Sequence, residues 1–288
     1  MSDGMSTNGR SSTFTVVGAT GQQGGATVDA LLAAGVAVRG LTRDPSSAPA
    51  QALARRGVQV VRADAGDPVS LRSAFAGSAG VLVMTTPFGP GGTERETEEG
   101  IAFVDAVQGA GVPHLVLNSV GGAERRTGIP HFESKRRVEE HVERLGLDAT
   151  LVRPVFFMEN LPGSVSEEDG ALVLRLPLPA RVPLQMVAVE DIGAASAAAL
   201  LHPARVPGGA IELVGDEVTG EQAAAAFGRA RGLPARYEAL PVEVLPDEDL
   251  TAMFTWFAHP PAYQGDVEAS RRLVPDLHTL DDWLAQSS

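Results

Sequence analysis

The residues with the clearest chemical potential are His131 and Lys135, in the stretch GIPHFESKRRVEEHVERLG (128–146). Lys135 is the only lysine among the 23 lysines and arginines of the chain. A spacing of four places both side chains on one helix face, one turn apart. An imidazole exchanges protons near neutral pH, and a compact ammonium binds differently from the planar fork of arginine. The pair is therefore the first candidate for chemistry in this sequence. The alternatives are a surface Lys135–Glu139 pair, and His131 as a polar cavity wall or a helix-start residue after Pro130.

A second candidate group is the glycine turn VVGATGQQGG (16–25), which lies between a short apolar run and a helical stretch. Glycines at this spacing permit a tight turn and let backbone N–H groups approach a pyrophosphate at the positive end of a helix. The context predicts a dinucleotide site, and the alternative is a glycine turn without a ligand. The predicted contacts are Gly18, Thr20, Gly21, Gln22, Gln23 and Gly24.

The end of the second predicted strand, LTRDP (41–45), bears on which dinucleotide binds. An arginine at this point accommodates the 2′-phosphate of NADP, whereas an acidic residue takes the ribose hydroxyls of NAD. Arg43 comes first, and Asp44 precedes Pro45, a position typical of a turn cap. This order favours NADP(H), with Asp44 as the competing alternative.

Residues that follow later strands complete the predicted cofactor site. Asp64 and Ala65 are expected near the adenine, and Thr86 and Pro87 near the nicotinamide half. Phe156 is expected on the nicotinamide ring or in a substrate pocket. The alternatives are a simple loop cap for Asp64 and core packing for Phe156.

Near-continuous apolar runs alternate with helical stretches in the first half of the chain. Runs of this kind are typical of strands buried on both faces of a parallel sheet. The expected strands are 14–18, 36–42, 58–63, 80–85, 114–120 and 149–154, and the expected helices 22–34, 50–57, 68–76, 94–110 and 132–145. Such alternation predicts an α/β fold, a Rossmann-type doubly wound parallel sheet over residues 14–154.

The pattern changes after Pro154. Residues 155–188 are rich in Pro and Leu and are expected to form irregular backbone. A helix is expected at 190–201, a strand at 210–215, a helix capped by Thr219, a strand at 235–240 and a mostly helical tail from 242. Together these predict a smaller C-terminal α/β lobe, residues 155–288, packed on the first domain.

Composition excludes several classes of protein. The 288 residues include no cysteine, so neither disulfides nor a thiolate site is expected. A net charge of −13 argues against nucleic-acid binding, and the apolar runs are too short for a membrane span. The histidines lack metal-ligand spacing, so no metal is expected. Residues 1–13 are polar without an apolar signal core, which predicts a disordered lead-in and a cytoplasmic protein.

Six motifs in chain order carry a family resemblance: VVGATGQQGG, LTRDP, RADAGDP, NSVGGAE, PHFESKRRVEEH and LVRPVFFMENL. Over about residues 14–260 the chain resembles the NmrA-like group of atypical short-chain dehydrogenases/reductases. The resemblance implies a Rossmann fold that prefers NADP(H), with a small C-terminal lobe. It also implies one of two roles found in the group, a small-molecule reductase or a redox-sensing regulator.

The resemblance also implies roles for three residues. Short-chain dehydrogenases generally use a serine after the fifth strand together with a Tyr-x-x-x-Lys pair. Ser119, His131 and Lys135 stand at these positions, so Lys135 is expected to bind the nicotinamide ribose and His131 to replace the proton-donating tyrosine. The two tyrosines of the chain, Tyr237 and Tyr263, lie far away in sequence.

Two functions follow from these motifs. The first is an NADPH-dependent reductase of a small carbonyl, quinone or enone. The second is a non-catalytic NADPH sensor that acts through a protein partner. A reductase needs a proton donor near the reacting oxygen and a sensor does not, so His131 is the residue that separates them.

Overall fold

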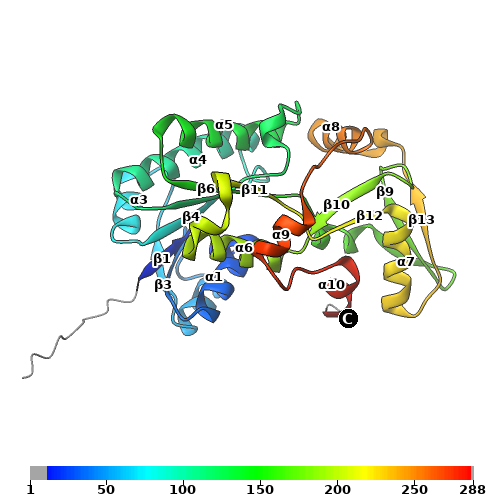
Figure 1. The fold of residues 1–288 in the computed structure, drawn as a ribbon, viewed down its shortest axis with the longest axis horizontal. Helices are drawn as coiled ribbons and strands as arrows, with labels where there is room; N and C mark the ends of the chain where they lie inside the picture. Colours follow the sequence, from blue (N-terminus) through cyan, green and yellow to red (C-terminus); the bar gives the residue numbers. More distant parts are fainter. Residues whose placement is uncertain (1–11, 287–288) are drawn as a thin grey trace, which may run out of the picture.

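A seven-stranded parallel sheet forms the centre of the computed structural model, which describes residues 12–286 (Figure 1). The strand order is β11-β6-β5-β4-β1-β2-β3, and all neighbours in it run parallel. This confirms the expected doubly wound α/β fold. The strands are β1 (Thr13–Val16), β2 (Ala37–Thr42), β3 (Gln59–Arg62), β4 (Gly80–Met84), β5 (Leu115–Asn118), β6 (Ala149–Pro154) and β11 (Ala210–Leu213).

Helices cover both faces of this sheet. One face carries α1 (Gln22–Ala33) and α6 (Val189–Leu201), and the other carries α3 (Pro68–Phe75), α4 (Gly92–Gly109) and α5 (Pro130–Leu145) (Figure 1). A further helix, α2 (Ala48–Arg55), links β2 to β3.

Strand β4 shows why the apolar runs are continuous. Leu82 packs into the core on the α1 and α6 side, whereas Val81 and Val83 pack into the core on the α3 to α5 side. All three side chains are fully buried. A strand between two helical layers must be apolar at every position, because alternate side chains enter different cores.

The expectation of irregular backbone over residues 155–188 is wrong. Four strands lie there: β7 (Phe156–Phe157), β8 (Val165–Glu168), β9 (Ala171–Leu176) and β10 (Pro183–Val187). Strands β8 and β9 form an antiparallel hairpin whose turn, Asp169-Gly170, has positive φ at both residues. An Asp-Gly pair between strand-like segments is a strong hairpin signal, and the nearby prolines obscured it.

Two three-stranded sheets organise the C-terminal lobe, in the orders β12-β10-β7 and β13-β9-β8. The expected Thr219 cap is confirmed, because its side chain accepts a hydrogen bond from Gln222 in a capping box at the start of α7 (Gly220–Arg231). The tail is mostly helical, as expected. The remaining elements are β12 (Asp216–Thr219), β13 (Ala235–Ala239), α8 (Glu248–Phe257), α9 (Val267–Leu273) and α10 (Leu280–Gln286).

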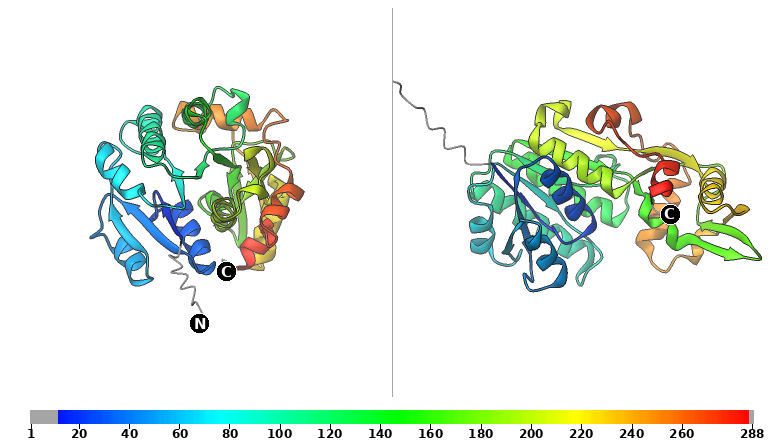
Figure 2. Two further views of the ribbon diagram at one scale, coloured as in Figure 1. Left: turned by 60° about the vertical axis from the view of Figure 1, so that its left-hand side comes forward. Right: turned by 90° about the horizontal axis from the view of Figure 1, so that it is seen from below.

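The chain crosses between the two parts more than once (Figure 2). Strand β11 and helix α6 both come after residue 154, yet β11 pairs with β6 and α6 packs on α1. The expected boundary at 154 is therefore not a boundary of the Rossmann sheet. Short 3-10 turns join the elements: Ala123–Arg125, Met158–Asn160, Pro162–Ser164, Pro203–Arg205, Pro207–Gly209 and Val242–Val244.

The predicted lead-in, residues 1–13, falls mostly outside the described residues, and Thr13 already belongs to β1. Within residues 12–286, no helix has both the length and the apolar character needed to cross a membrane.

The backbones of α1 and α6 come very close together at one point of their contact. A Cβ added at Gly193 of α6 would lie 2.4 Å from the carbonyl carbon of Ala26 in α1. The predicted phosphate turn leads directly into α1, so a contact that fixes α1 also fixes the position of the turn.

We expect Gly193→Ala to lower the free energy of unfolding by about 1–3 kcal/mol, because the two helices must separate to admit the methyl group. Gly25→Ala in α1 is the matched control. Its Cβ would lie 3.6 Å from the oxygen of Ala19, an ordinary contact, so higher helix propensity should leave stability equal or up to about 1 kcal/mol higher. Urea unfolding of both variants measures the difference. Equal stabilities would contradict the close contact.

Candidate functional site

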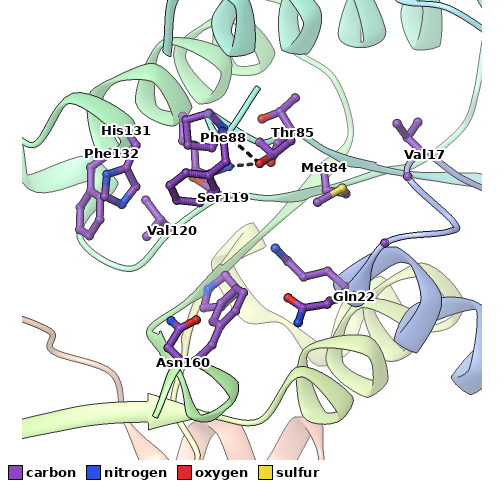
Figure 3. A pocket seen from close by; sticks show the side chains of 18 of the residues that line it. Val17, Gln22, Met84, Thr85, Phe88, Ser119, Val120, His131, Phe132 and Asn160 are labelled. Atoms are coloured by element: carbon purple, nitrogen blue, oxygen red, sulfur yellow. Dashed lines mark hydrogen bonds between the residues drawn. The ribbon is translucent and has the colours of Figure 1, made fainter. Parts of the chain in front are cut away.

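One cavity of about 860 Å³ opens at the carboxyl ends of the parallel strands. This is the edge where doubly wound sheets bind ligands, and the volume suits a large organic ligand. In Figure 3, Met84, Ser119 and His131 lie along one side, with Gln22 and Asn160 across from them. The cavity wall includes most predicted site residues: Gly18, Thr20, Gly21, Gln22, Gln23, Arg43, Thr86, Pro87, Ser119, His131, Lys135 and Phe156.

The glycine turn brings the start of α1 to the cavity. Gly18 has φ +67°, and a Cβ there would lie 2.7 Å from Sδ of Met84. Gly21 is the N-cap of α1, and no side chain among residues 12–286 caps the helix, so its first N–H groups are left for another partner. Gly24 instead permits close packing, because its Cβ would lie 2.2 Å from the carbonyl oxygen of Gly18, and it does not line the cavity.

The two glutamines after the turn differ in their contacts. Gln22 is exposed and lines the cavity. Gln23 also lines it, but its side-chain oxygen accepts a hydrogen bond from Asn118 Nδ2 at 3.0 Å. Asn118 in turn accepts from Ser196 Oγ at 3.0 Å. This series of bonds ties α1 to β5 and α6, which fixes the position of the turn.

Arg43 and Asp44 both line the cavity, yet Asp44 is already engaged. Its carboxylate accepts hydrogen bonds from the hydroxyl and the backbone N–H of Ser46, which lower the pKa of the Asp44 carboxyl. Asp44 therefore caps its turn, and Arg43 is the cation at this end of the cavity.

Asp64 and Ala65 are not part of the wall. The Asp64 carboxylate accepts the N–H of Gly66 at 2.8 Å, which matches the loop-cap alternative. The residue of this strand end that lines the cavity is Ala63. The predicted loop thus borders the cavity, through the residue that precedes the two predicted ones.

Lys135 pairs with a buried carboxylate rather than with a surface residue. Its Nζ lies 2.8 Å from Oε1 of Glu96 and donates to the carbonyl oxygen of Thr85 at 3.1 Å. Glu96 also accepts from the hydroxyls of Thr85 and Ser134, and its side chain is fully buried. The alternative Lys135–Glu139 pair is wrong, because Glu139 pairs with Arg153 and Arg136.

His131 is held by a residue from a distant part of the chain. Its Nδ1 lies 2.6 Å from Oδ1 of Asp249 in α8, 118 residues further along. The ring lines the cavity, and its edge meets Phe132 with centroids 4.7 Å apart. The nitrogen left for a ligand is Nε2.

Ser119 is the clearest sign that a polar ligand belongs in the cavity. It lines the cavity, only 5% of the residue is exposed, and its Oγ is buried without a hydrogen-bond partner among the described residues. An unpaired buried hydroxyl is costly, so it indicates a ligand atom in the complete site. With the uncapped start of α1 and Arg43, it forms a donor set that fits a dinucleotide.

An apolar, aromatic group of side chains lines part of the same cavity as Ser119. Phe156 lies edge-on to Phe254, with centroids 6.4 Å apart, and both line the cavity. Thr86 and Pro87 sit on the opposite loop beside Phe88, which is 82% exposed.

Tyr263 belongs to the same wall, although it lies far away in sequence. Burial, and then the negative charge of Glu212, raise the pKa of its phenol well above the usual range, so the hydroxyl stays protonated. Its ring stacks 6.4 Å from that of Phe132. Sequence reasoning missed Tyr263, Asp249 and Glu96 among others, and no spacing signal pointed to these three.

Removing the buried carboxylate of Glu96 should strongly destabilise the fold. We expect Glu96→Ala to lower the free energy of unfolding by about 3–5 kcal/mol, because it leaves the Lys135 ammonium and two hydroxyls without their partner. The control is Asp281→Ala, which breaks an ion pair with Arg229 in which the side chains are 60% and 61% exposed. That change should cost no more than about 1 kcal/mol. Thermal and urea unfolding test this, and similar losses in both variants would refute it.

Known proteins resemble this chain in sequence and in fold. The sequence profile of the NmrA-like family matches residues 10–284. An NmrA-like family domain-containing oxidoreductase, FrzB, from Cladobotryum sp is 31% identical over 277 residues, which cover 84% of this chain and 82% of the relative.

Two solved structures share the fold at lower identity. The crystal structure of Nmra, a negative transcriptional regulator, superposes with a TM-score of 0.84 at 22% identity, covering 96% of this chain and 95% of that one. An NADPH-dependent quinone oxidoreductase from Escherichia coli, complexed with NADPH, has a TM-score of 0.79 at 23% identity, covering 95% and 99%. The match over nearly the whole chain leads to one conclusion: this protein belongs to the NmrA-like family.

Proposed function

We propose that the protein is an NADPH-dependent reductase of a small carbonyl, quinone or enone. The observation that carries this proposal is the joint position of Ser119 and His131 on one cavity that also contains the glycine turn. The names of its relatives support the same chemistry, since FrzB is called an oxidoreductase and the Escherichia coli protein a quinone oxidoreductase.

The proposed cofactor arrangement follows the cavity from end to end. The uncapped start of α1 would hold the pyrophosphate, because backbone N–H groups and the helix dipole favour an anion there. Arg43 would bind the 2′-phosphate, which makes NADP(H) the proposed dinucleotide. Lys135 would face the nicotinamide ribose, because its ammonium has a donor left after its bonds to Glu96 and Thr85.

When bound, reduced nicotinamide supplies a hydride to the substrate. His131 supplies the accompanying proton: its imidazolium releases the Nε2 proton to the substrate oxygen and regains one from water. Ser119 donates a hydrogen bond to the same oxygen as negative charge develops there. Phe156, Phe254 and Met253 exclude water from this end, which strengthens both polar interactions.

The second candidate is an NADPH sensor that acts through a protein partner. One observation favours it: the Lys135 charge is already balanced by Glu96, so this lysine is less available to assist a proton donor than a free one. A sensor requires a different affinity for the cofactor in each of its two states. The apolar wall beside Ser119 favours the reductase, because a sensor needs no closed substrate space.

Arg43→Ala should weaken NADPH binding by about 10- to 100-fold and leave NADH binding unchanged. The reason is the loss of charge-assisted hydrogen bonds to the 2′-phosphate, worth about 1.5–3 kcal/mol. Calorimetric titration with NADPH, NADP+ and NADH measures this. Arg55→Ala, at an exposed arginine of α2 outside the cavity wall, is the control and should bind as the parent does. Equal losses for NADPH and NADH would exclude the proposed role of Arg43.

His131→Ala should reduce the turnover of a quinone or enone with NADPH by about 10²- to 10⁴-fold, the usual contribution of a general acid. NADPH affinity should stay within about twofold, because the imidazole acts on the substrate. His141→Ala is the control on the same helix, where the ring pairs with Asp105 near the surface. If the parent binds NADPH but turns over no substrate in a screen of quinones, enones and carbonyls, the sensor is the better interpretation.

A further inference from the structure

The contact between His131 and Asp249 joins the start of one helix to the start of another. Oδ1 of Asp249 lies 2.6 Å from Nδ1 of His131 and 3.4 Å from its backbone nitrogen. The side chains are 12% and 25% exposed, so the contact is largely shielded from water. One carboxylate oxygen thus contacts both Nδ1 and the backbone N–H of His131.

Helix geometry explains why the carboxylate stays at this point. Helix α5 begins at Pro130, and its N-cap, Ile129, has no side chain that caps the helix. Asp249 supplies a negative charge at that uncapped end from outside. It also lies in the first turn of its own helix, α8, whose N-cap is Asp247. Asp249 therefore lies at the positive ends of two helix dipoles, a favourable place for an acidic side chain.

We propose that Asp249 is the positioning residue for His131 and sets its tautomer. An ionised carboxylate only accepts hydrogen bonds, so Nδ1 must carry its proton. The neutral ring then presents the lone pair of Nε2, and the imidazolium presents the Nε2 proton, to the cavity. Second groups that orient an imidazole in this way occur where histidine moves protons. The inference rests on the proposed reductase function for its catalytic consequence.

The proton balance of the reductive step follows from this arrangement. The imidazolium gives its Nε2 proton to the substrate oxygen as that substrate accepts a hydride. The N–H bond at Nε2 breaks, an O–H bond forms, and the neutral ring keeps its other proton on Nδ1, hydrogen-bonded to Asp249. Water then returns a proton to Nε2, so the carboxylate itself never changes its protonation.

The same helix also contributes to the cavity wall. Leu250, Met253 and Phe254 of α8 line the cavity next to Asp249. When α8 is in place, it brings the apolar wall and the carboxylate together. Orientation of the proton donor and exclusion of water from the substrate space therefore depend on one element.

Long-range ¹H–¹⁵N NMR of the full chain tests the tautomer directly, with His131→Gln used to assign the signals. The parent should show the Nδ1–H tautomer of neutral His131. Asp249→Ala should shift the ring toward the Nε2–H tautomer that free imidazole side chains favour, and lower kcat about 10-fold or more with NADPH affinity unchanged. Asp249→Asn, whose amide can present an N–H donor to Nδ1 in place of a carboxylate oxygen, should also favour the Nε2–H tautomer and lower kcat.

Glu248→Gln is the control, because Glu248 is exposed in the first turn of the same helix and should leave spectrum and turnover as in the parent. An Nε2–H tautomer in the parent, or a kcat loss in Asp249→Ala without a tautomer change, would overturn the positioning role. If the parent turns over no substrate, the reductase proposal fails by itself. The NMR spectra would still decide whether Asp249 sets the tautomer.

Discussion

The buried carboxylate of Glu96 is the interaction on which the arrangement of the site depends. A charge without solvent access must be fully paired, and Glu96 meets this demand with Lys135, Thr85 and Ser134. These partners come from the loop after β4 and from α5, while Glu96 itself belongs to α4. One pairing requirement therefore fixes the relative positions of three elements that border the cavity.

Two other ion pairs of the fold show where the geometry of arginine is required. Arg153 makes two hydrogen bonds of 2.9 Å to the fully buried Glu139, and Arg125 makes bonds of 2.8 and 2.9 Å to Glu212. Such two-point pairs require the planar fork of arginine. At Lys135 the partners are one carboxylate oxygen and one carbonyl oxygen, which suit a compact ammonium. Each of these basic side chains thus matches the geometry of its acceptors.

The C-terminal part of the chain completes the site rather than merely covering it. Asp249 holds His131, and Tyr263 and Phe254 form the apolar wall next to Ser119. The Rossmann layers contain the glycine turn and Arg43, whereas Leu250, Met253 and Phe254 of the cavity wall come from α8. The completed cavity therefore depends on contacts between segments more than a hundred residues apart.

Features that depend on neighbouring residues could be predicted from the sequence, whereas the partners of the polar side chains could not. The strands of the Rossmann sheet up to β6, the glycine turn and the shared helix face of His131 and Lys135 follow from local spacing, because backbone geometry repeats with a fixed period. Tertiary packing pairs Lys135 with Glu96 and places Asp249 against His131. A buried charge needs a counter-charge beside it in the folded protein. Which residue supplies that counter-charge depends on how distant elements pack together, and the periodicity of the sequence does not encode this packing.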